Sequence, residues 1–558
     1  MITANSGSGG SHTATALTLV LLTLASGTAT QWVAATHPTT LVPWVATFAL
    51  VVAWTFRRPR SVDLFEPLTF LSWMHYAPAF VVGGALLATG VVLYPYPSIV
   101  ADPVASCALA LSYIGIGYMA LRLGCQWQGA RALGARLERW LPAPPKEGTI
   151  PLVAILAVIA IGLAANYGAF RAGIVGFAVP RPPGPLDAAV SYAGLLMALG
   201  HFLFWYRWFS PQQKRPPVVA LVVPLLVVVA SMVILGNRGA LLLSYLHALL
   251  AYRFARGRLT VVQGVAAVAL AFVALGIGMT YGSLFRQLRG GEAGSFGAAV
   301  KDAAAAPSTA PATPPVPATP PAPASPIAPA AAPPVAVTPA APAPRRTPKA
   351  APPPRPTALP PPSLERHLEV AAQTATTLFR NPNATPVTRL LVLAGQRLNI
   401  LSDASVTIAR YPTLQHLEAK YGIANMWTMT WTGFVPRALW PGKPKVSDAR
   451  AYSLLYFDYG GNSYATTPPV DLIRNVGPFG MPLGMALFGC VLGALSVALL
   501  TSASAGRGER AALFSLMLVN VNLEGSFGLL LPNMFRVALV VIVGLALVRL
   551  FSVRPRPR

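Results

Sequence analysis

The strongest constraint on the fold is the number of long apolar segments in the sequence. Residues 217–235 and 481–500, for example, are almost continuously hydrophobic over about 20 residues, the length that an α-helix needs to cross the hydrocarbon core of a bilayer. Their hydrophobicity does not alternate from one residue to the next, as it would in the strands of a membrane barrel. Because only helices and closed barrels satisfy the backbone inside a membrane, the pattern predicts an all-α integral membrane protein.

The apolar runs divide the chain into about twelve predicted transmembrane helices. The composition agrees, because 54% of the residues are hydrophobic and only 11% are charged. The first run has no basic region before it, so we expect a retained span and not a cleaved signal peptide. The predicted spans are residues 14–35, 40–56, 68–92, 103–121, 149–166, 186–206, 217–236, 239–255, 259–281, 476–502, 511–530 and 533–551.

The basic residues predict how the chain is oriented. The net charge of +25 does not indicate nucleic-acid binding, because most of the basic residues flank apolar spans and do not cluster on a soluble surface. With a cytoplasmic N-terminus, the inner connections and the C-terminal tail hold twenty of them, whereas the short outer loops hold four. Basic residues accumulate in cytoplasmic loops. The sequence therefore predicts a multi-pass membrane protein with both termini in the cytoplasm.

The predicted orientation places a large loop between the ninth and tenth spans outside the cytoplasm. Residues 303–362 are almost wholly Pro, Ala, Thr and Ser, a composition that cannot bury a core and that predicts a disordered insert. Residues 363–475 have a mixed composition with helical spacing, which predicts a folded outer loop. We therefore divide the chain into the nine-helix bundle 1–281, the start of the loop 282–302, the insert 303–362, the folded loop 363–475, and the last three helices with their basic tail 476–558.

Three stretches of the sequence carry a resemblance to a known family. Residues 434–444 read FVPRALWPGKP, and a Thr–Pro turn followed by DLIRNVG at 471–477 comes directly before a glycine-rich span. Residues 236–241 read GNRGAL, and residues 63–67 read DLFEP. The first stretch resembles the outer-loop pattern of Wzy-type O-antigen and exopolysaccharide polymerases, although that family often carries Glu where this chain has Asp471. The other two stretches are further points of resemblance to the same family.

The resemblance implies a C-type glycosyltransferase for polysaccharide biosynthesis in the cell envelope. Such an enzyme joins repeat units carried on undecaprenyl diphosphate at the outer face of the inner membrane, with no cofactor and no metal. Its implied partners are the lipid-linked oligosaccharide substrate, membrane lipids, and a chain-length regulator or export machinery; nucleic acid is not among them. An O-antigen ligase shares the same topology and donor, and a membrane transporter or flippase of lipid-linked glycans is the alternative from another class.

The chemistry of a diphosphate leaving group explains why outward-facing arginines are the expected site residues. Arginine stays protonated and offers forked donors that match phosphate oxygens. We predict catalytic roles for Arg238, Arg437, Asp471 and Arg474, with Asp471 as general base, and substrate-binding roles for Lys443, Arg286, Arg397, Arg536 and Trp440. For the basic residues the alternative is an interfacial anchor, and for Asp471 it is a helix N-cap.

Two further features lie in the last three predicted spans. Glu524 is their only acidic residue, so it is either a functional group or the structural partner of Arg536. Gly480, Gly484, Gly489 and Gly493 form two small-xxx-small pairs, which permit close approach of helices. We expect these glycines to pack the bundle internally.

Overall fold

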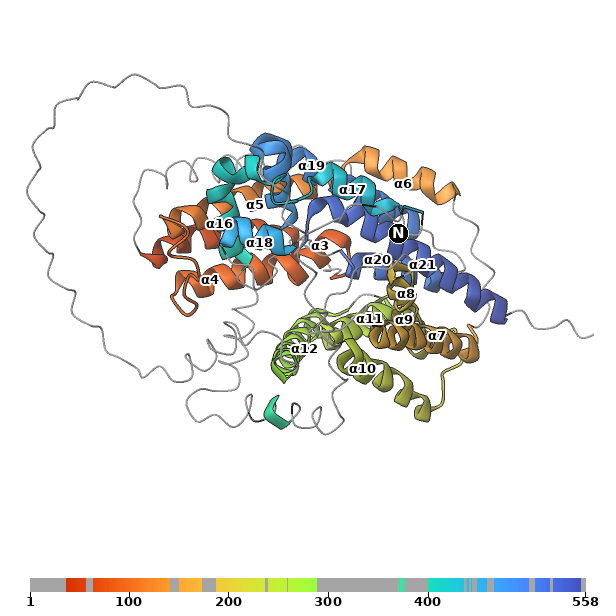
Figure 1. The fold of residues 1–558 in the computed structure, drawn as a ribbon. Helices are drawn as coiled ribbons and strands as arrows, with labels where there is room; N and C mark the ends of the chain where they lie inside the picture. Colours follow the sequence, from red (N-terminus) through yellow and green to blue (C-terminus); the bar gives the residue numbers. More distant parts are fainter. Residues whose placement is uncertain are drawn as a thin grey trace, which may run out of the picture.

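The computed structural model describes most of the predicted membrane region and part of the predicted outer loop. Every regular element among the described residues is a helix, which confirms the all-α prediction (Figure 1). The described residues are 37–56, 64–140, 150–172, 187–235, 239–257, 259–288, 370, 372–374, 376, 400–435, 439–440, 443, 449–458, 466–500, 507–521 and 525–552.

One group of helices packs around α5 and α19, in the upper part of Figure 1. The long apolar runs explain the long members, and the short helices between residues 400 and 457 come from the predicted outer loop. The members are η1 (Pro38–Leu41), α2 (Val42–Ala53), η2 (Trp54–Phe56), α3 (Pro67–Leu71), η3 (Ser72–Val82), α4 (Gly83–Ala88), α5 (Pro103–Gln126), α6 (Gln128–Trp140), α16 (Ile400–Leu414), η5 (Gln415–Leu417), α17 (Met426–Phe434), α18 (Ala449–Phe457) and α19 (Pro468–Leu500).

A second group, below the first in Figure 1, packs around α9. Its members are α7 (Leu152–Arg171), α8 (Asp187–Ala193), α9 (Leu195–Phe209), η4 (Val218–Leu221), α10 (Val222–Leu235), α11 (Ala240–Arg256) and α12 (Val261–Leu288). The last two helices, α20 (Arg507–Val519) and α21 (Phe527–Ser552), contact both groups. The C-terminal helices therefore join the two halves of the bundle around one hydrophobic core.

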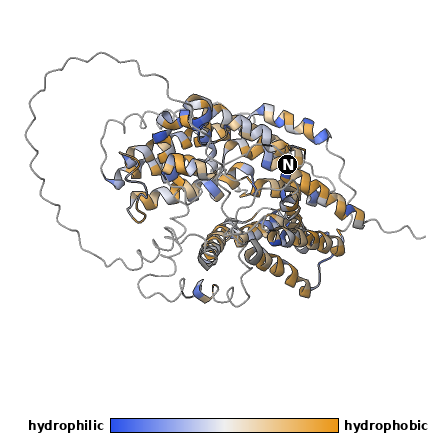
Figure 2. Cartoon of the chain, in the orientation of Figure 1, coloured by the Kyte–Doolittle hydropathy of each residue, from blue (hydrophilic) through white to orange (hydrophobic). Residues whose placement is uncertain are grey.

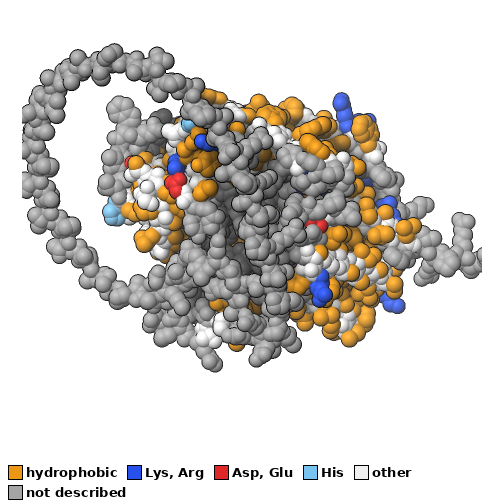
Figure 3. Space-filling model, viewed as in Figure 1, with side chains coloured by type: hydrophobic (Ala, Val, Ile, Leu, Met, Phe, Trp, Pro, Cys, Tyr) orange, Lys and Arg blue, Asp and Glu red, His pale blue; other side chains and the backbone are white. Residues whose placement is uncertain are grey.

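Eight helices in the described part of the chain are long and apolar enough to cross a membrane. Their outward surfaces are also apolar: Val153, Val262 and Phe479 are each more than 70% exposed. Figure 2 shows this hydropathy along the helices, and orange side chains cover much of the described surface in Figure 3. The eight are Pro38–Phe56, Pro67–Ala88, Pro103–Gln126, Leu152–Arg171, Ala189–Phe209, Val262–Gly282, Pro468–Leu500 and Phe527–Leu550.

Four predicted spans are not among these eight. Residues 14–35 lie outside the described residues, and α11 and α20 are only 17 and 13 residues long. The apolar run Val218–Met232 is also shorter than a full span. At about 1.5 Å per residue, the 13 residues of α20 fall well short of a bilayer core about 30 Å thick. The twelve-span count therefore stays a prediction, whereas a multi-pass architecture agrees with the eight apolar helices.

Glycines bring α5 and α19 into the most extensive helix contact of the bundle. A Cβ added at Gly124 would lie 2.0 Å from the carbonyl oxygen of Ala486, and one at Gly489 would lie 2.1 Å from that of Leu121. The backbones therefore touch directly. This agrees with the expected internal packing for Gly489 and Gly493, whereas Gly480 and Gly484 face side chains from the start of their own helix.

Candidate functional site

A break near the start of α19 sets the geometry of the candidate site. The helix begins at Pro468, a residue suited to the first helical position, and its regular path is interrupted at Gly477. Gly477 has a φ of +77°, which glycine adopts without the steric cost that a side chain would add, and Pro478 follows it. The predicted span at 476–502 thus has a short helical segment before it, which carries Asp471, Arg474 and Asn475.

Arg474 lies between two carboxylates in the interior of the protein. Its Nη1 donates to Glu418 Oε2 at 2.6 Å, and its Nη2 donates to Asp471 Oδ1 at 2.7 Å. Arg474 is 1% exposed and Asp471 is 0% exposed. Charges this deeply buried are tolerated only when they are paired and hydrogen-bonded. We call Asp471, Arg474, Glu418 and Tyr456 the ionic network.

Tyrosines complete the surroundings of the guanidinium. Tyr456 donates its hydroxyl to Glu418 Oε1 at 2.6 Å, and Arg474 Cζ lies 6.0 Å from the centre of the Tyr452 ring. Burial raises the pKa of Tyr452 to about 12, although its bond to Thr407 and the charge of Arg474 act in the opposite direction. Burial and the bond to Glu418 also raise the pKa of Tyr456. Both phenols therefore stay protonated near neutral pH, and Tyr456 remains a donor to Glu418.

Asp471 also holds the start of the last helix. Its Oδ2 accepts the backbone N–H of Phe527, the first residue of α21, at 2.8 Å, while its Oδ1 also accepts from Asn475 at 3.1 Å. A carboxylate at a helix N-terminus satisfies a free N–H and interacts favourably with the helix dipole. Asp471 therefore caps a helix, as the N-cap alternative proposed, but the capped helix is α21 and not its own helix α19.

Backbone contacts from neighbouring segments surround the same residues. Asn475 Oδ1 accepts the N–H of Met426, the first residue of α17, at 2.7 Å, and Gln415 donates to the carbonyl oxygen of Arg474 at 2.8 Å. The short segment before Gly477 thereby connects η5, α17, α18 and α21. It is one of the points at which the helices of the predicted outer loop are fixed to the membrane bundle.

This geometry favours positioning over direct chemistry for Asp471 and Arg474. A general base must reach the proton that it removes, but both oxygens of Asp471 already accept hydrogen bonds and none of the side chain is exposed. Two buried polar atoms, Arg474 Nε and Thr467 Oγ1, have no hydrogen-bond partner among the described residues. A direct role for Asp471 or Arg474 in the reaction would require these hydrogen bonds to break. That catalytic role stays a prediction.

Arg536 lies in α21 and joins three elements. One Nη donates to the hydroxyl of Tyr192 in α8 at 2.8 Å, and the other donates to the carbonyl oxygen of Gly433 in α17. The guanidinium carbon lies 5.5 Å from the centre of the Tyr192 ring. Arg536 therefore holds the residue directly before Phe434, where the FVPRALWPGKP motif begins.

The motif itself is partly described. Lys443 is 7% exposed, and its Nζ donates to the carbonyl oxygen of Val435 at 2.8 Å, which connects the two ends of the motif. The backbone N–H of Lys443 bonds to the carbonyl oxygen of Trp440 at 3.1 Å, and Trp440 is 41% exposed. Arg437, between these positions, lies outside the described residues.

Four other predicted functional residues lie, wholly or in their side chains, outside the part of the chain that the structure describes. Arg238, Arg397 and Glu524 are not among the described residues, and the side chain of Arg286 in α12 is likewise not described. The turn that carries Arg238 is short, because α10 ends at Leu235 and α11 begins at Ala240. The predicted roles of these four residues stay predictions.

Glu418 and Tyr456 are the members of the ionic network that sequence reasoning missed. Glu418 lies 56 residues before Arg474, and no local spacing joins the two. Asp471 was singled out by its motif at 471–477 and by its neighbour Arg474, and Glu418 has neither signal. Only tertiary packing distinguishes Glu418 from the other acidic residues of the predicted outer loop.

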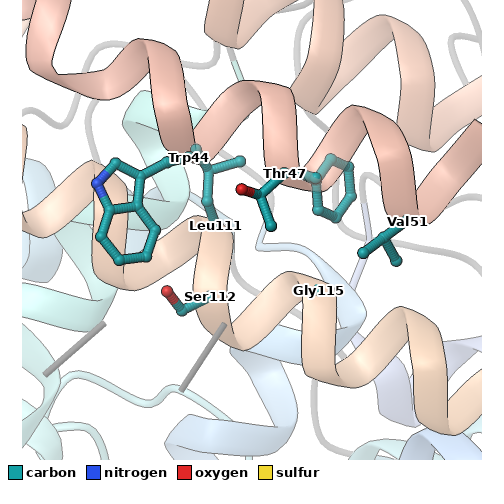
Figure 4. A pocket seen from close by; sticks show the side chains of 7 residues that line it. Trp44, Thr47, Val51, Leu111, Ser112 and Gly115 are labelled. Carbon is teal, nitrogen blue, oxygen red and sulfur yellow. The ribbon is translucent and has the colours of Figure 1, made fainter. Parts of the chain in front are cut away.

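A small cavity lies between α2 and α5, apart from the ionic network. Figure 4 shows its walls, formed by Trp44, Thr47, Phe48, Val51, Leu111, Ser112 and Gly115. The hydroxyls of Thr47 and Ser112 both donate to carbonyl oxygens of their own helices, at 2.8 and 2.9 Å. The cavity therefore offers no charged group for catalysis. The described residues also contain no group of three or more His, Cys, Asp or Glu side chains that could hold a metal ion.

Comparison with known proteins adds no relative to these observations. No family model, no curated protein and no solved structure matches this chain. The likeness to polysaccharide polymerases therefore depends on the sequence motifs at 236–241, 434–444 and 471–477.

Proposed function

We propose that this chain is a metal-independent glycosyltransferase of the bacterial inner membrane that polymerises undecaprenyl diphosphate-linked oligosaccharide repeat units into O-antigen or exopolysaccharide. The observation that supports this most is the anchoring of the FVPRALWPGKP motif. Arg536 holds Gly433 just before the motif, and Lys443 bonds back to Val435 within it. Contacts that fix described residues on both sides of Arg437 suit the preorganised binding of a diphosphate.

The reaction that we propose is a displacement at an anomeric carbon. A sugar hydroxyl of one lipid-linked unit attacks the anomeric carbon of another, the bond from that carbon to the diphosphate oxygen breaks, and the lipid diphosphate leaves. A base takes the hydroxyl proton. Negative charge grows on the diphosphate in the transition state, so guanidinium groups fixed beside it lower the barrier.

We assign the residues to two kinds of role. Arg238 and Arg437 contact the diphosphate from two loops that the predicted topology places on the same side of the membrane. Asp471 and Arg474 act as positioning residues, because their contacts fix the outer-loop helices to the bundle. Arg536 and Lys443 hold the motif, and the half-exposed Trp440 is available to stack on a sugar face.

Alanine and lysine variants of Arg238 and Arg437 test the proposal. Each alanine variant should reduce the turnover of lipid-linked repeat units by the purified protein on the order of 100-fold, because a preorganised electrostatic contact is lost. Lysine should restore activity only in part, because it keeps the charge but not the planar fork. Arg171→Ala is the matched control, since Arg171 is an exposed arginine at the end of α7 on the same predicted side.

The readout is polymer length on a gel, with the amount of each variant in the membrane measured beside it. Wild-type polymer from both alanine variants would rule out the arginine mechanism. If a variant accumulated less in the membrane but its remaining protein kept its activity, the arginine would have a structural role. Transfer of glycan to a different acceptor without lengthening of the chain would identify a ligase, and movement of lipid-linked units across vesicles without bond formation would identify a flippase.

A further inference from the structure

The amphipathic helix α6 has one face fixed against the bundle. It follows α5 after a single extended residue, Trp127, and packs along α19. Ala130 is fully buried, and a Cβ added at Gly134 would lie 2.5 Å from the carbonyl oxygen of Ala494. The small residues of α6 therefore hold it directly against the backbone of a membrane-spanning helix.

The other faces of α6 are basic and apolar. Arg131, Arg136 and Arg139 are exposed, as are Leu133 at 47% and Trp140 at 85%. Arg136 comes three residues after Leu133 and four before Trp140, a spacing that places all three on one flank of the helix. The single acidic residue of α6, Glu138, lies 3.6 Å from Arg510 of α20. The exposed flank therefore presents positive charge beside apolar side chains.

The position of α6 in the bundle explains what such a surface could contact. Its neighbours α5 and α19 are both candidate membrane spans, and α6 lies beside the C-terminal end of each. Arg549, near the C-terminal end of α21, pairs there with Glu509 in the first turn of α20. The ionic network lies at the opposite end of α19. A helix at the end of two spans is placed where lipid headgroups lie, and Leu and Trp next to Arg is the pattern of an interfacial helix.

We propose that α6 is a binding site for anionic phospholipid headgroups. Arg136 and Arg139 donate to the phosphate oxygens, Arg131 adds charge from the adjoining face, and Leu133 and Trp140 enter the acyl boundary. Anionic lipid fits better than an acidic protein because the basic flank continues directly from membrane-spanning helices, which leaves bilayer as its neighbour. This proposal is independent of the proposed polymerase activity.

Hydrogen exchange on the full-length protein in vesicles tests the proposal locally. One preparation contains phosphatidylcholine alone, and the other an equimolar mixture of phosphatidylcholine and phosphatidylglycerol. Amides of residues 128–140 should exchange at least fivefold more slowly with phosphatidylglycerol present, and added salt should remove most of that difference because it screens exposed charges. Vesicles expose both leaflets to the same lipid, so the result does not depend on orientation.

The variant Arg131→Gln/Arg136→Gln/Arg139→Gln should lose the dependence on phosphatidylglycerol, and the corresponding triple lysine variant should keep most of it. Arg256→Gln, at an exposed arginine in the last turn of α11, is the matched control and should behave as wild type. Equal exchange of wild-type α6 in both lipids would overturn the proposal, even if the triple variant failed to fold. A lipid dependence that survives in a folded triple glutamine variant would overturn it as well.

Discussion

At the residue scale, the central feature is a guanidinium held between two carboxylates that come from distant parts of the sequence. Asp471 accepts three hydrogen bonds, from Arg474, Asn475 and the backbone of Phe527. Glu418 accepts from Arg474 and Tyr456, and its side chain is 11% exposed. The two carboxylates therefore differ in how completely the protein replaces their hydration.

We expect Asp471→Asn to destabilise the protein strongly, by about 3–5 kcal/mol, the usual cost of breaking a buried ion pair. The amide group of asparagine would keep one acceptor oxygen but place its NH2 against a donor, either Arg474 or the backbone N–H of Phe527. The measurement is thermal unfolding of the purified protein in detergent. Asp458→Asn is the matched control: Asp458 pairs with Arg410 at 2.7 Å, but its side chain is 62% exposed, so the change should have little effect. Equal melting temperatures for both variants would contradict this account.

At the element scale, the contact between α5 and α19 depends on the absence of side chains where the backbones meet. Gly124→Ala should lower stability, because its Cβ would lie 2.0 Å from a carbonyl oxygen and the helices would have to separate. Gly168→Ala in α7 is the control, since a Cβ there meets nothing within 4 Å, and alanine favours a helix over glycine. The melting temperature of Gly168→Ala should therefore equal or exceed that of the wild type. A wild-type melting temperature for Gly124→Ala would show instead that α5 and α19 can shift to accommodate a side chain.

The sequence predicted the long apolar elements well and their interruptions poorly. Spans such as Pro103–Gln126 appear where hydrophobicity is continuous, because length and apolarity are local properties. The predicted span 511–530 was too long: α20 ends at Val519, and the polar Asn520 side chain bonds to Leu516 of its own helix. Asp471 and Arg474 of the ionic network were singled out from the sequence, but for catalytic roles, and no local pattern could indicate that Glu418 approaches them.

At the scale of the whole molecule, the predicted orientation follows from the asymmetry of basic residues. A reporter fused near Ala330 should be exported, whereas one fused at Arg131 or after Arg558 should remain in the cytoplasm. The structure supplies a consistency check, because α6, which contains Arg131, and the outer-loop helices lie at opposite ends of α19. Reversed reporter activities would overturn the topology and every site assignment that depends on it.

The Pro- and Ala-rich insert gives a second prediction at this scale. Its composition provides too little large apolar surface for a core, so deletion of residues 303–362 should leave folding and polymer synthesis largely intact. Membrane abundance and polymer length report the two properties separately. If the deleted protein failed to accumulate or made no polymer, the insert would have a role beyond that of a linker.

The bond between Asp471 and Phe527 has a consequence for how the protein is made. The two residues are 56 positions apart, and Phe527 begins the last helix. Before the ribosome reaches Phe527, the Asp471 carboxylate lacks one of its donors, and of the two C-terminal helices only α20 is present to contact both groups. The contact between Asp471 and α21 therefore forms only after Phe527 has been synthesised. Nascent chains that stop before Phe527 would expose an incompletely paired charge to the membrane proteases that remove unfinished proteins.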